Sequence, residues 1–281
     1  VVKNSGLRGR GGAAFPTGLK WSFTAKANAD QKYVICNADE GEPGTFKDRL
    51  IMEGDPQAVL EGMALAGYAV GATKGYIYVR GEYRKPIRIL QKAISQAVEK
   101  GVLGKNIFNS GFSFDIEVRE GAGAYICGEE TALIESIEGR RGEPRIKPPY
   151  PGVAGLWQKP TVVNNVETLA NIPMIVLKGA EWYKGFGTEN SAGTKLFTLF
   201  GDVKNKCVVE APFGTPLRQI IFEMGQGMKN DTKLKMVQIG GGSASCLNDQ
   251  YLDVSLDYEH LAEVGASIGS GAIFVLNEDH C

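Results

Sequence analysis

A cluster of glycines near the amino end of the chain has the composition of an anion-binding loop. Residues 6–18 contain five glycines and two arginines. Successive glycines let backbone N–H groups point into one concavity, which suits a phosphate. The spacing Gly9-x-Gly11-x-x-Ala14 matches a dinucleotide-binding fingerprint, but no strand precedes it, so the context of that motif fails. A ligand-binding loop is favoured over a flexible arginine–glycine arm of the RNA-binding kind.

An acidic turn follows the apolar run over residues 33–36. It contains Asn37, Asp39, Glu40 and Glu42. Carboxylates repel phosphate but accept hydrogen bonds from ribose or ribityl hydroxyls and from ring N–H groups. Because ligands of α/β sheets gather beyond the carboxyl ends of strands, this turn is predicted to face the sugar or ring part of a nucleotide. The alternatives are a solvated turn and a loop that binds a divalent metal. The residue spacing of an EF-hand metal loop is absent, which disfavours the second alternative.

A second turn repeats this combination of glycines and acids. Residues 121–131 follow an expected strand over residues 114–119 and lead into a helix that begins with Glu129 and Glu130. The glycines allow a ligand to approach the backbone closely. The alternative is purely structural, since the helix dipole favours glutamate in a first turn whether or not a ligand binds. Cys127 lies among apolar and small residues and is expected to be a buried, inert thiol.

The elements that must position these turns alternate between strand and helix. Residues 1–20 are expected to be a loop. Apolar runs predict strands over 33–36, 76–80 and 114–119, and apolar faces at helical spacing predict helices over 55–70, 85–100, 129–138 and from 164 onward. This alternation predicts an α/β layered sheet. After an expected linker over 187–193, a hairpin over 195–200 and 207–210, a helix from Pro216, and strands over 236–239 and 273–276 predict a small α+β module.

Composition narrows the class of protein further. The 281 residues carry 31 Lys and Arg against 32 Asp and Glu, a net charge of −1 that disfavours non-specific nucleic-acid binding. No apolar run approaches the roughly 18 residues that span a bilayer. Five cysteines without a C-x-x-C pair indicate reduced thiols and no metal site held by this chain alone. The ends, Val1 and Cys281, are those expected of a fragment of a longer protein.

Six ordered segments resemble one family. They are residues 5–23, 36–49, 75–83, 121–139, 147–152 and 159–171. They are similar to the NADH-binding flavoprotein subunit of respiratory complex I and its relatives in NAD-linked hydrogenases and formate dehydrogenases. The resemblance implies a Rossmann-like α/β domain that binds FMN and NADH over residues 1–190 and a small α+β ubiquitin-like (SLBB, β-grasp) domain over 191–281. The sequence departs from the family at Ala14, where a third glycine is usual.

The resemblance also implies a set of site residues. Hydride passes from NADH to FMN, so no side chain need act as a catalytic nucleophile or base. The residues implied to hold FMN are Gly9, Arg10, Gly11, Lys20, Asn37, Asp39, Glu40, Gly128, Glu129, Asn164, Asn165 and Thr168. The residues implied to line the NADH side are Phe15, Phe23, Glu42, Glu130, Lys147 and Tyr150.

The family's electron acceptors are iron–sulfur clusters. A C-terminal helical domain holds a [4Fe–4S] cluster in the family, and this chain ends before it. The resemblance implies a thioredoxin-fold [2Fe–2S] subunit and a larger iron–sulfur subunit as partners, in the cytoplasm or on the cytoplasmic face of a membrane complex. The alternative is a non-catalytic module that holds FMN and docks onto an iron–sulfur partner. The parent complex, the final acceptor and the choice between NADH and NADPH stay open.

Overall fold

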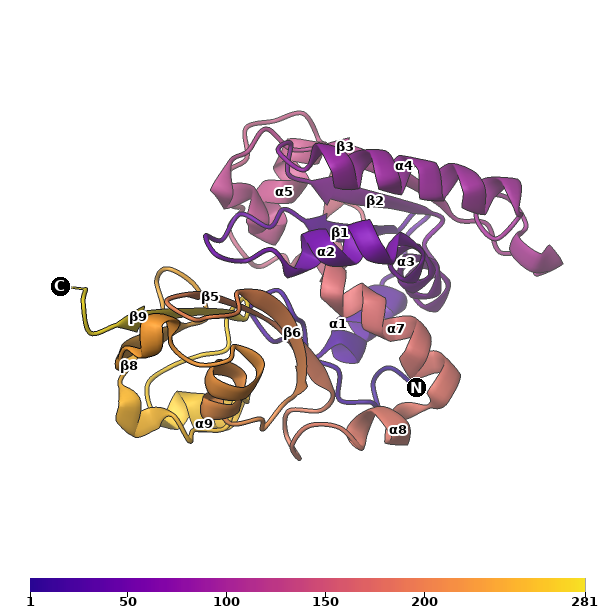
Figure 1. Cartoon of the computed structure of the whole chain (residues 1–281). Helices are drawn as coiled ribbons and strands as arrows, with labels where there is room; N and C mark the ends of the chain where they lie inside the picture. Colours follow the sequence, from indigo (N-terminus) through magenta and orange to yellow (C-terminus); the bar gives the residue numbers. More distant parts are fainter. Residues whose placement is uncertain (281) are drawn as a thin grey trace. The chain divides into compact units, whose positions relative to one another are not determined.

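The structure is a computed structural model that describes residues 1–280, and its contacts form two compact units (Figure 1). The parallel-sheet unit comprises Phe15–Gly41 and Asp48–Leu177. The β-rich unit comprises Val1–Ala14, Glu42–Lys47 and the residues from Lys178 onward. Each unit is therefore assembled from segments that are not adjacent in the sequence. The boundaries of these contact-based units differ from those of the expected domains, residues 1–190 and 191–281. The domain boundaries stay a prediction.

A four-stranded parallel sheet is the centre of the first unit, with the strand order β3-β2-β1-β4. Its strands are β1 (Tyr33–Ala38), β2 (Lys74–Val79), β3 (Asp115–Glu120) and β4 (Thr161–Asn165). The chain moves outward from β1 to β2 and β3, then returns to place β4 on the other side of β1. The α/β layered sheet expected from the alternating pattern is confirmed.

Helix α1 precedes the first strand of this sheet, and further helices follow each strand. They are α1 (Thr17–Lys26), α2 (Lys47–Gly54), α3 (Pro56–Val70), α4 (Arg84–Glu99), α5 (Glu130–Ile137), α6 (Pro151–Ala154) and α7 (Val166–Lys178), with 3-10 turns η1 (Ile107–Asn109), η2 (Tyr125–Gly128) and η3 (Leu156–Gln158). The start of α3 is fixed by a helix cap. Asp55 accepts a hydrogen bond from the Ala58 amide at 3.1 Å, and Pro56 occupies the first turn, as the sequence predicted.

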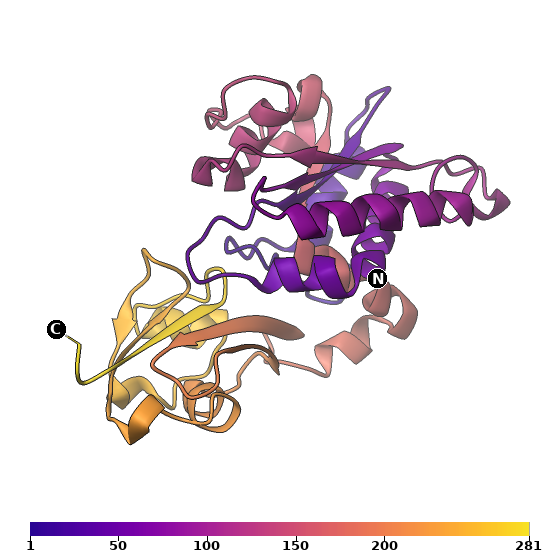
Figure 2. The ribbon, with the colours of Figure 1, turned by 45° about the horizontal axis from the view of Figure 1, so that its top comes forward.

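Alternating side chains give the sheet two apolar faces. On one face, Ile35, Tyr76 and Val163 pack with Leu133 and Ile134 of α5. On the other, the helix α3 lies against β1 and β2, and α4 runs beside β3 (Figures 1 and 2). Because both faces are covered, only the ends of the strands can present polar groups to a ligand.

The β-rich unit contains a five-stranded mixed sheet, with the strand order β6-β5-β9-β7-β8. Its elements are α8 (Ala180–Lys184), β5 (Thr194–Gly201), β6 (Cys207–Pro212), the π-helix η4 (Gln219–Met224), η5 (Lys229–Asp231), β7 (Leu234–Ile239), β8 (Cys246–Leu247), η6 (Asp249–Tyr251), α9 (Tyr258–Glu263) and β9 (Ala272–Asn277). The predicted hairpin is confirmed as the antiparallel pair β5–β6, which Figure 2 shows from a second direction.

Two local expectations were wrong, and one helix was missed. Helix α1 begins at Thr17, inside the segment expected to be a loop. The strand β4 occupies Thr161–Asn165, where the sequence was expected to open a helix at Asn164. In the structure the helix α7 begins only at Val166, because Asn164 and Asn165 still pair with β1. Helix α2 was not expected at all.

We predict that Gly62 cannot be enlarged, because α3 and α7 approach each other at this residue. A methyl group there would lie 2.1 Å from the carbonyl oxygen of Leu169. Gly62→Ala is expected to lower the free energy of unfolding by about 1–3 kcal/mol, measured by urea denaturation. The matched control is Gly54→Ala at the end of α2, where nothing lies within 4 Å of the added methyl. A neutral Gly62→Ala would contradict the packing described here.

A second prediction concerns Ala14, whose backbone has a φ of 54°. This is the left-handed region, in which a Cβ atom is unfavourable. Ala14→Gly is therefore expected to raise the free energy of unfolding by about 0.5–1 kcal/mol. Ala25→Gly, on the exposed side of α1, serves as the control and should lower it by about 1 kcal/mol. Equal effects of the two substitutions in thermal or urea unfolding would refute the assignment of strain to Ala14.

Candidate functional site

The carboxyl ends of β1 and β4 form the part of the parallel sheet best suited to a ligand. The strand order reverses between these two strands, and an α/β sheet leaves a crevice where the order reverses. The register pairs Cys36 with Asn164 and Asn37 with Asn165. Polar residues from both strands therefore lie side by side at this edge, which we call the switch-point edge.

Asn37 connects the switch-point edge to the second glycine-rich turn. Its Nδ2 donates to the carbonyl oxygen of Gly128 at 2.8 Å, and its Oδ1 accepts from the Asp39 amide at 3.2 Å. A methyl group at Gly128 would lie 3.5 Å from the Asp39 carbonyl oxygen, so the two turns are in close contact. The sequence predicted both turns as ligand loops, and within this unit the structure brings them together.

Asp39 is the one acid of this edge whose side chain is left unsatisfied. Its Oδ2 atom is buried and has no hydrogen-bond partner within residues 1–280. Burial raises the pKa of Asp39 to about 6, although the nearby Arg80 guanidinium acts in the opposite direction. A buried oxygen without a donor is unfavourable unless a ligand or water supplies one.

Glu129 is both a helix cap and a partner of a lysine. One carboxylate oxygen accepts from the amides of Thr131 and Ala132 at 2.8 and 3.0 Å, which caps α5. The other accepts from Lys147 Nζ at 2.8 Å. Glu129 therefore has the structural role at the start of a helix that was the alternative to ligand binding. Its contact with Lys147 adds a second role.

Four charged side chains alternate in sign along one side of the site. Lys20 Nζ lies 2.7 Å from Glu130, Glu130 lies 3.3 Å from Lys147, and Lys147 lies 2.8 Å from Glu129. Burial alone would raise the pKa of Glu130, but the ammonium groups of Lys20 and Lys147 outweigh it and hold that pKa below its ordinary value. The same balance lowers the pKa of Glu129 and raises that of Lys147. We call this set the Lys–Glu chain.

The asparagines of β4 are anchored by neighbouring elements. Asn164 accepts a hydrogen bond from Trp21 Nε1 at 2.7 Å. Asn165 Oδ1 accepts from the Glu167 amide at 2.9 Å, which caps α7, and its Nδ2 donates to Asp48 at 2.6 Å. Thr168 is fully buried in the first turn of α7. Trp21 and Asp48 were missed in the sequence, since neither belongs to a glycine-rich or acidic turn.

Glu40 has a structural contact set that the sequence did not predict. Its carboxylate accepts from the amides of Asp48 and Arg49 at 2.9 and 3.2 Å and from the Tyr83 hydroxyl at 2.9 Å. It therefore satisfies the first amides of α2 and connects that helix to the residues after β2. Its side chain is almost completely buried.

The aromatic residues expected on the NADH side are exposed. Phe15, Phe23 and Tyr150 are 46%, 51% and 61% exposed, so their rings are available for stacking. Tyr125, in η2, is exposed to the same degree at 63% and was not among the predicted site residues. Its place within the second glycine-rich turn was the signal that could have identified it.

The remaining predicted site residues belong to the β-rich unit. Arg10 is completely buried, and its guanidinium donates to the carbonyl oxygens of Arg8, Ala192 and Thr194 and to the Tyr183 hydroxyl at 2.7–3.1 Å. A role of Gly9, Arg10 and Gly11 in anion binding would therefore use the backbone of this segment. Glu42 accepts from the Gly242 amide at 2.6 Å.

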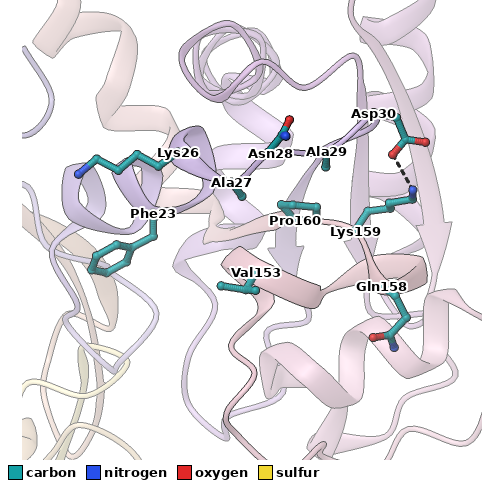
Figure 3. Close-up of a pocket in the computed structure, with 10 residues that line it drawn as sticks. All are labelled: Phe23, Lys26, Ala27, Asn28, Ala29, Asp30, Val153, Gln158, Lys159 and Pro160. Atoms are coloured by element: carbon teal, nitrogen blue, oxygen red, sulfur yellow. Dashed lines mark hydrogen bonds and ion pairs between the residues drawn. The ribbon is translucent and has the colours of Figure 1, made fainter.

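A separate open pocket of about 570 Å³ lies at the opposite, amino ends of β1 and β4 (Figure 3). Its wall includes Phe23, Val153 and Pro160, and the ion pair between Asp30 and Lys159 at 2.5 Å. Phe23 alone is shared with the predicted site residues. This pocket does not contain the polar groups of the switch-point edge, so we place the candidate site at that edge.

Within residues 1–280, no three His, Cys, Asp or Glu side chains are grouped so that they could hold a metal ion. In the same part of the chain no helix has the length and apolarity needed to cross a bilayer. Cys36 and Cys127 are buried, as expected for Cys127, and burial raises the pKa of the Cys36 thiol.

The Lys–Glu chain predicts a defined pH dependence of stability. Lys147→Met is expected to lower the free energy of unfolding at pH 7 by about 1 kcal/mol, since it removes the partner of two part-buried carboxylates. A carboxyl whose folded pKa is lowered stabilises the protein above its unfolded pKa of about 4.3 and loses this effect as the pH falls through the folded value.

The difference between Lys147→Met and the wild type should therefore shrink in urea denaturation as the pH falls through about 4. Lys184→Met, which removes an exposed ion pair with Glu181, is the control and should change nothing measurable. A Lys147→Met effect that is independent of pH would contradict the electrostatic account.

The chain is similar to known proteins over most or all of its length. Residues 2–174 match the model of the Nuo51 FMN-binding domain. Over its whole length the chain is 55% identical to the NADP-reducing hydrogenase subunit HndC of Solidesulfovibrio fructosivorans and 50% identical to an NADH-quinone oxidoreductase subunit of Rhizobium meliloti. It spans 57% and 67% of those proteins, respectively. Over 99% of its length it is 48% identical to an NADH-quinone oxidoreductase subunit of Escherichia coli, of which it spans 63%.

A solved structure shows the same fold. The chain superposes on an NAD⁺-reducing [NiFe]-hydrogenase in the air-oxidised state with a TM-score of 0.88 and 39% identity. The match covers 99% of this chain and 46% of that one. Since the family model covers more than half of the chain and the curated relatives are about half identical to it, the chain belongs to the Nuo51 FMN-binding domain family.

Proposed function

We propose that this chain is the FMN- and NADH-binding part of an NADH dehydrogenase flavoprotein subunit. The observation that carries the proposal is the switch-point edge, with its unsatisfied Asp39 oxygen, its close glycine at Gly128 and its fixed asparagines. An unsatisfied acceptor fits a ligand that brings hydroxyl or ring N–H donors, and a flavin nucleotide brings both. The residues present therefore fit FMN, in agreement with the family to which the chain belongs.

The site residues implied by the family resemblance are kept as part of this proposal. For FMN they are Gly9, Arg10, Gly11, Lys20, Asn37, Asp39, Glu40, Gly128, Glu129, Asn164, Asn165 and Thr168. For NADH they are Phe15, Phe23, Glu42, Glu130, Lys147 and Tyr150. Glu40, Asn164 and Asn165 act in this assignment by fixing the edge, since their side chains are bonded to α2, α1 and α7.

The protein orients the reactants in this proposal. Bound FMN would supply the hydride acceptor for the nicotinamide. The Lys–Glu chain holds two ammonium groups at fixed positions, and the exposed rings of Phe15, Phe23 and Tyr150 are stacking surfaces for a nicotinamide or adenine ring. No side chain of the switch-point edge is required to act as a nucleophile or strong base.

A larger assembly completes the proposed function. We place the flavin domain at residues 1–190 and a ubiquitin-like SLBB domain at residues 191–281. The proposed partners are a thioredoxin-fold [2Fe–2S] subunit and a larger iron–sulfur subunit, with a [4Fe–4S] cluster in a helical region outside this chain and a cytoplasmic location. The identity of this chain to a hydrogenase subunit and to an NADH-quinone oxidoreductase subunit supports the proposal. NADH and NADPH both need testing.

Flavin binding tests the proposed function directly. The chain is expected to bind FMN at micromolar concentration, seen as quenched flavin fluorescence and a yellow protein after gel filtration. Asn37→Ala removes the bond between β1 and η2 and should weaken binding about tenfold. Asn28→Ala, in the pocket at the opposite end of the strands, should leave binding unchanged. A wild-type chain that does not bind FMN at micromolar concentration would refute the proposed function.

Steady-state turnover separates the enzyme from its rival. A dehydrogenase loaded with FMN should oxidise NADH with ferricyanide, and Tyr150→Ala should raise the KM for NADH without weakening FMN binding. Tyr68→Ala, which removes an exposed ring on α3, is the control and should have no effect. The rival is a module that holds FMN and docks onto an iron–sulfur partner, and it predicts FMN binding with no NADH oxidation.

A further inference from the structure

Asp39 differs from the other acids at the switch-point edge because one of its carboxylate oxygens has no hydrogen-bond donor in its own unit. Glu129 and Glu130 are paired with lysines, and Glu40 caps α2. Asp39 Oδ2 is buried with no donor among the described residues. The inference drawn from this contrast rests on the proposed flavin site and concerns what happens when the site is filled.

The charged groups around Asp39 explain why it stays unpaired. Just after the end of β2, the Arg80 guanidinium acts on Asp39, but it donates to Glu82 at 3.0 and 3.2 Å and to the Glu40 carbonyl oxygen at 2.6 Å. Glu82 therefore satisfies Arg80 and repels Asp39 as well. Tyr78, also on β2, is a neutral hydroxyl, since burial raises its pKa.

The other side of Asp39 faces the backbone. Gly128 of η2 lies beside Asp39. A methyl group added at Gly128 would lie within 4 Å of both the carbonyl oxygen and the Oδ2 atom of Asp39. Asn37 on β1 bonds both the Asp39 amide and Gly128. These contacts bury the carboxyl without supplying a donor to Oδ2, and a larger residue at 128 would fill the space beside it.

We propose that the Asp39 carboxyl releases a proton to solvent when a flavin binds, because a ribityl hydroxyl or ring N–H of the ligand donates the hydrogen bond that Oδ2 lacks. A donated hydrogen bond favours the charged form of a carboxyl. In the free protein burial holds the Asp39 pKa at about 6, so the group is half protonated near that pH. In the complex it becomes a carboxylate. Asp39 is in this sense a positioning residue whose protonation is linked to cofactor affinity.

Binding that releases a proton becomes tighter as the pH rises and weaker as it falls. With a free pKa of about 6 and a bound pKa near the ordinary value of about 3.9, affinity should be about tenfold weaker at about pH 5 than at about pH 8. About half a proton should be released per ligand at about pH 6.

The test uses riboflavin beside FMN, because the FMN phosphate itself titrates near pH 6. Riboflavin binding to the 281-residue chain is measured by fluorescence quenching from about pH 5 to about pH 8 and by calorimetry at about pH 6 in two buffers of different ionisation enthalpy. The expected results are the tenfold change in Kd and a net release of protons. Proton uptake, or an unchanged Kd over this range, would overturn the proposal.

Asp39→Asn assigns the effect to this side chain. The variant should bind riboflavin with a Kd that no longer depends on pH, and its fold is checked by circular dichroism. Asp30→Asn, which alters an exposed acid at the opposite end of β1, should keep the wild-type dependence. His260, whose pKa is raised by Asp257, is intact in both variants. A pH dependence of the Kd that came from His260 would therefore survive in Asp39→Asn, and that result would overturn the proposal.

The failure of this inference is distinguishable from failure of the proposed function. If the wild-type chain binds neither riboflavin nor FMN at about pH 8, the flavin site itself is refuted. If both bind and the Kd of riboflavin is constant with pH, the flavin site stands and the linkage to Asp39 is refuted. The calorimetric measurement needs no variant, so it decides the matter even if Asp39→Asn does not fold.

Discussion

The parallel pairing of β1 with both β2 and β4 is the constraint on which the candidate site depends. It places β1 at the centre of the strand-order reversal and sets Asn37 beside Asn165. Every further contact of the edge follows from this register. Asn37 reaches Gly128, Lys20 reaches the Val163 carbonyl oxygen at 2.8 Å, and Asn165 caps α7. A shift of β4 by one residue would turn each of its asparagines to the other face of the sheet and separate these groups.

Electrostatics at this edge is a balance of burial against pairing. Glu130 is part-buried but remains ionised because it pairs with two lysines, whereas the Oδ2 atom of Asp39 is buried and the nearby Arg80 is already bonded to Glu82. Two carboxyl groups thus have opposite pKa shifts within one site. Such a contrast is typical of functional sites, where groups in different environments are prepared for different roles.

Much of the fold could be predicted from local patterns, and the failures have physical causes. The helix α3 and the hairpin β5–β6 carried strong periodicity, a cap and turn residues. The strand β4 was missed because Asn164 and Asn165 are poor strand formers and good helix caps, and only pairing with β1 makes them part of a sheet. The acidic and glycine-rich turns were found from composition, but the lysine partners of Glu129 and Glu130 lie far away in the sequence, where no local pattern reveals them.

The discontinuous make-up of the β-rich unit has a consequence for biosynthesis. Residues 1–14 leave the ribosome well before the residues that they contact within their unit, which lie beyond Lys178. Arg10, for example, is buried by the carbonyl oxygens of Ala192 and Thr194. More than 160 further residues, roughly those between 14 and 178, must be synthesised before this arginine can be buried. A segment that is synthesised early is therefore among the last to fold.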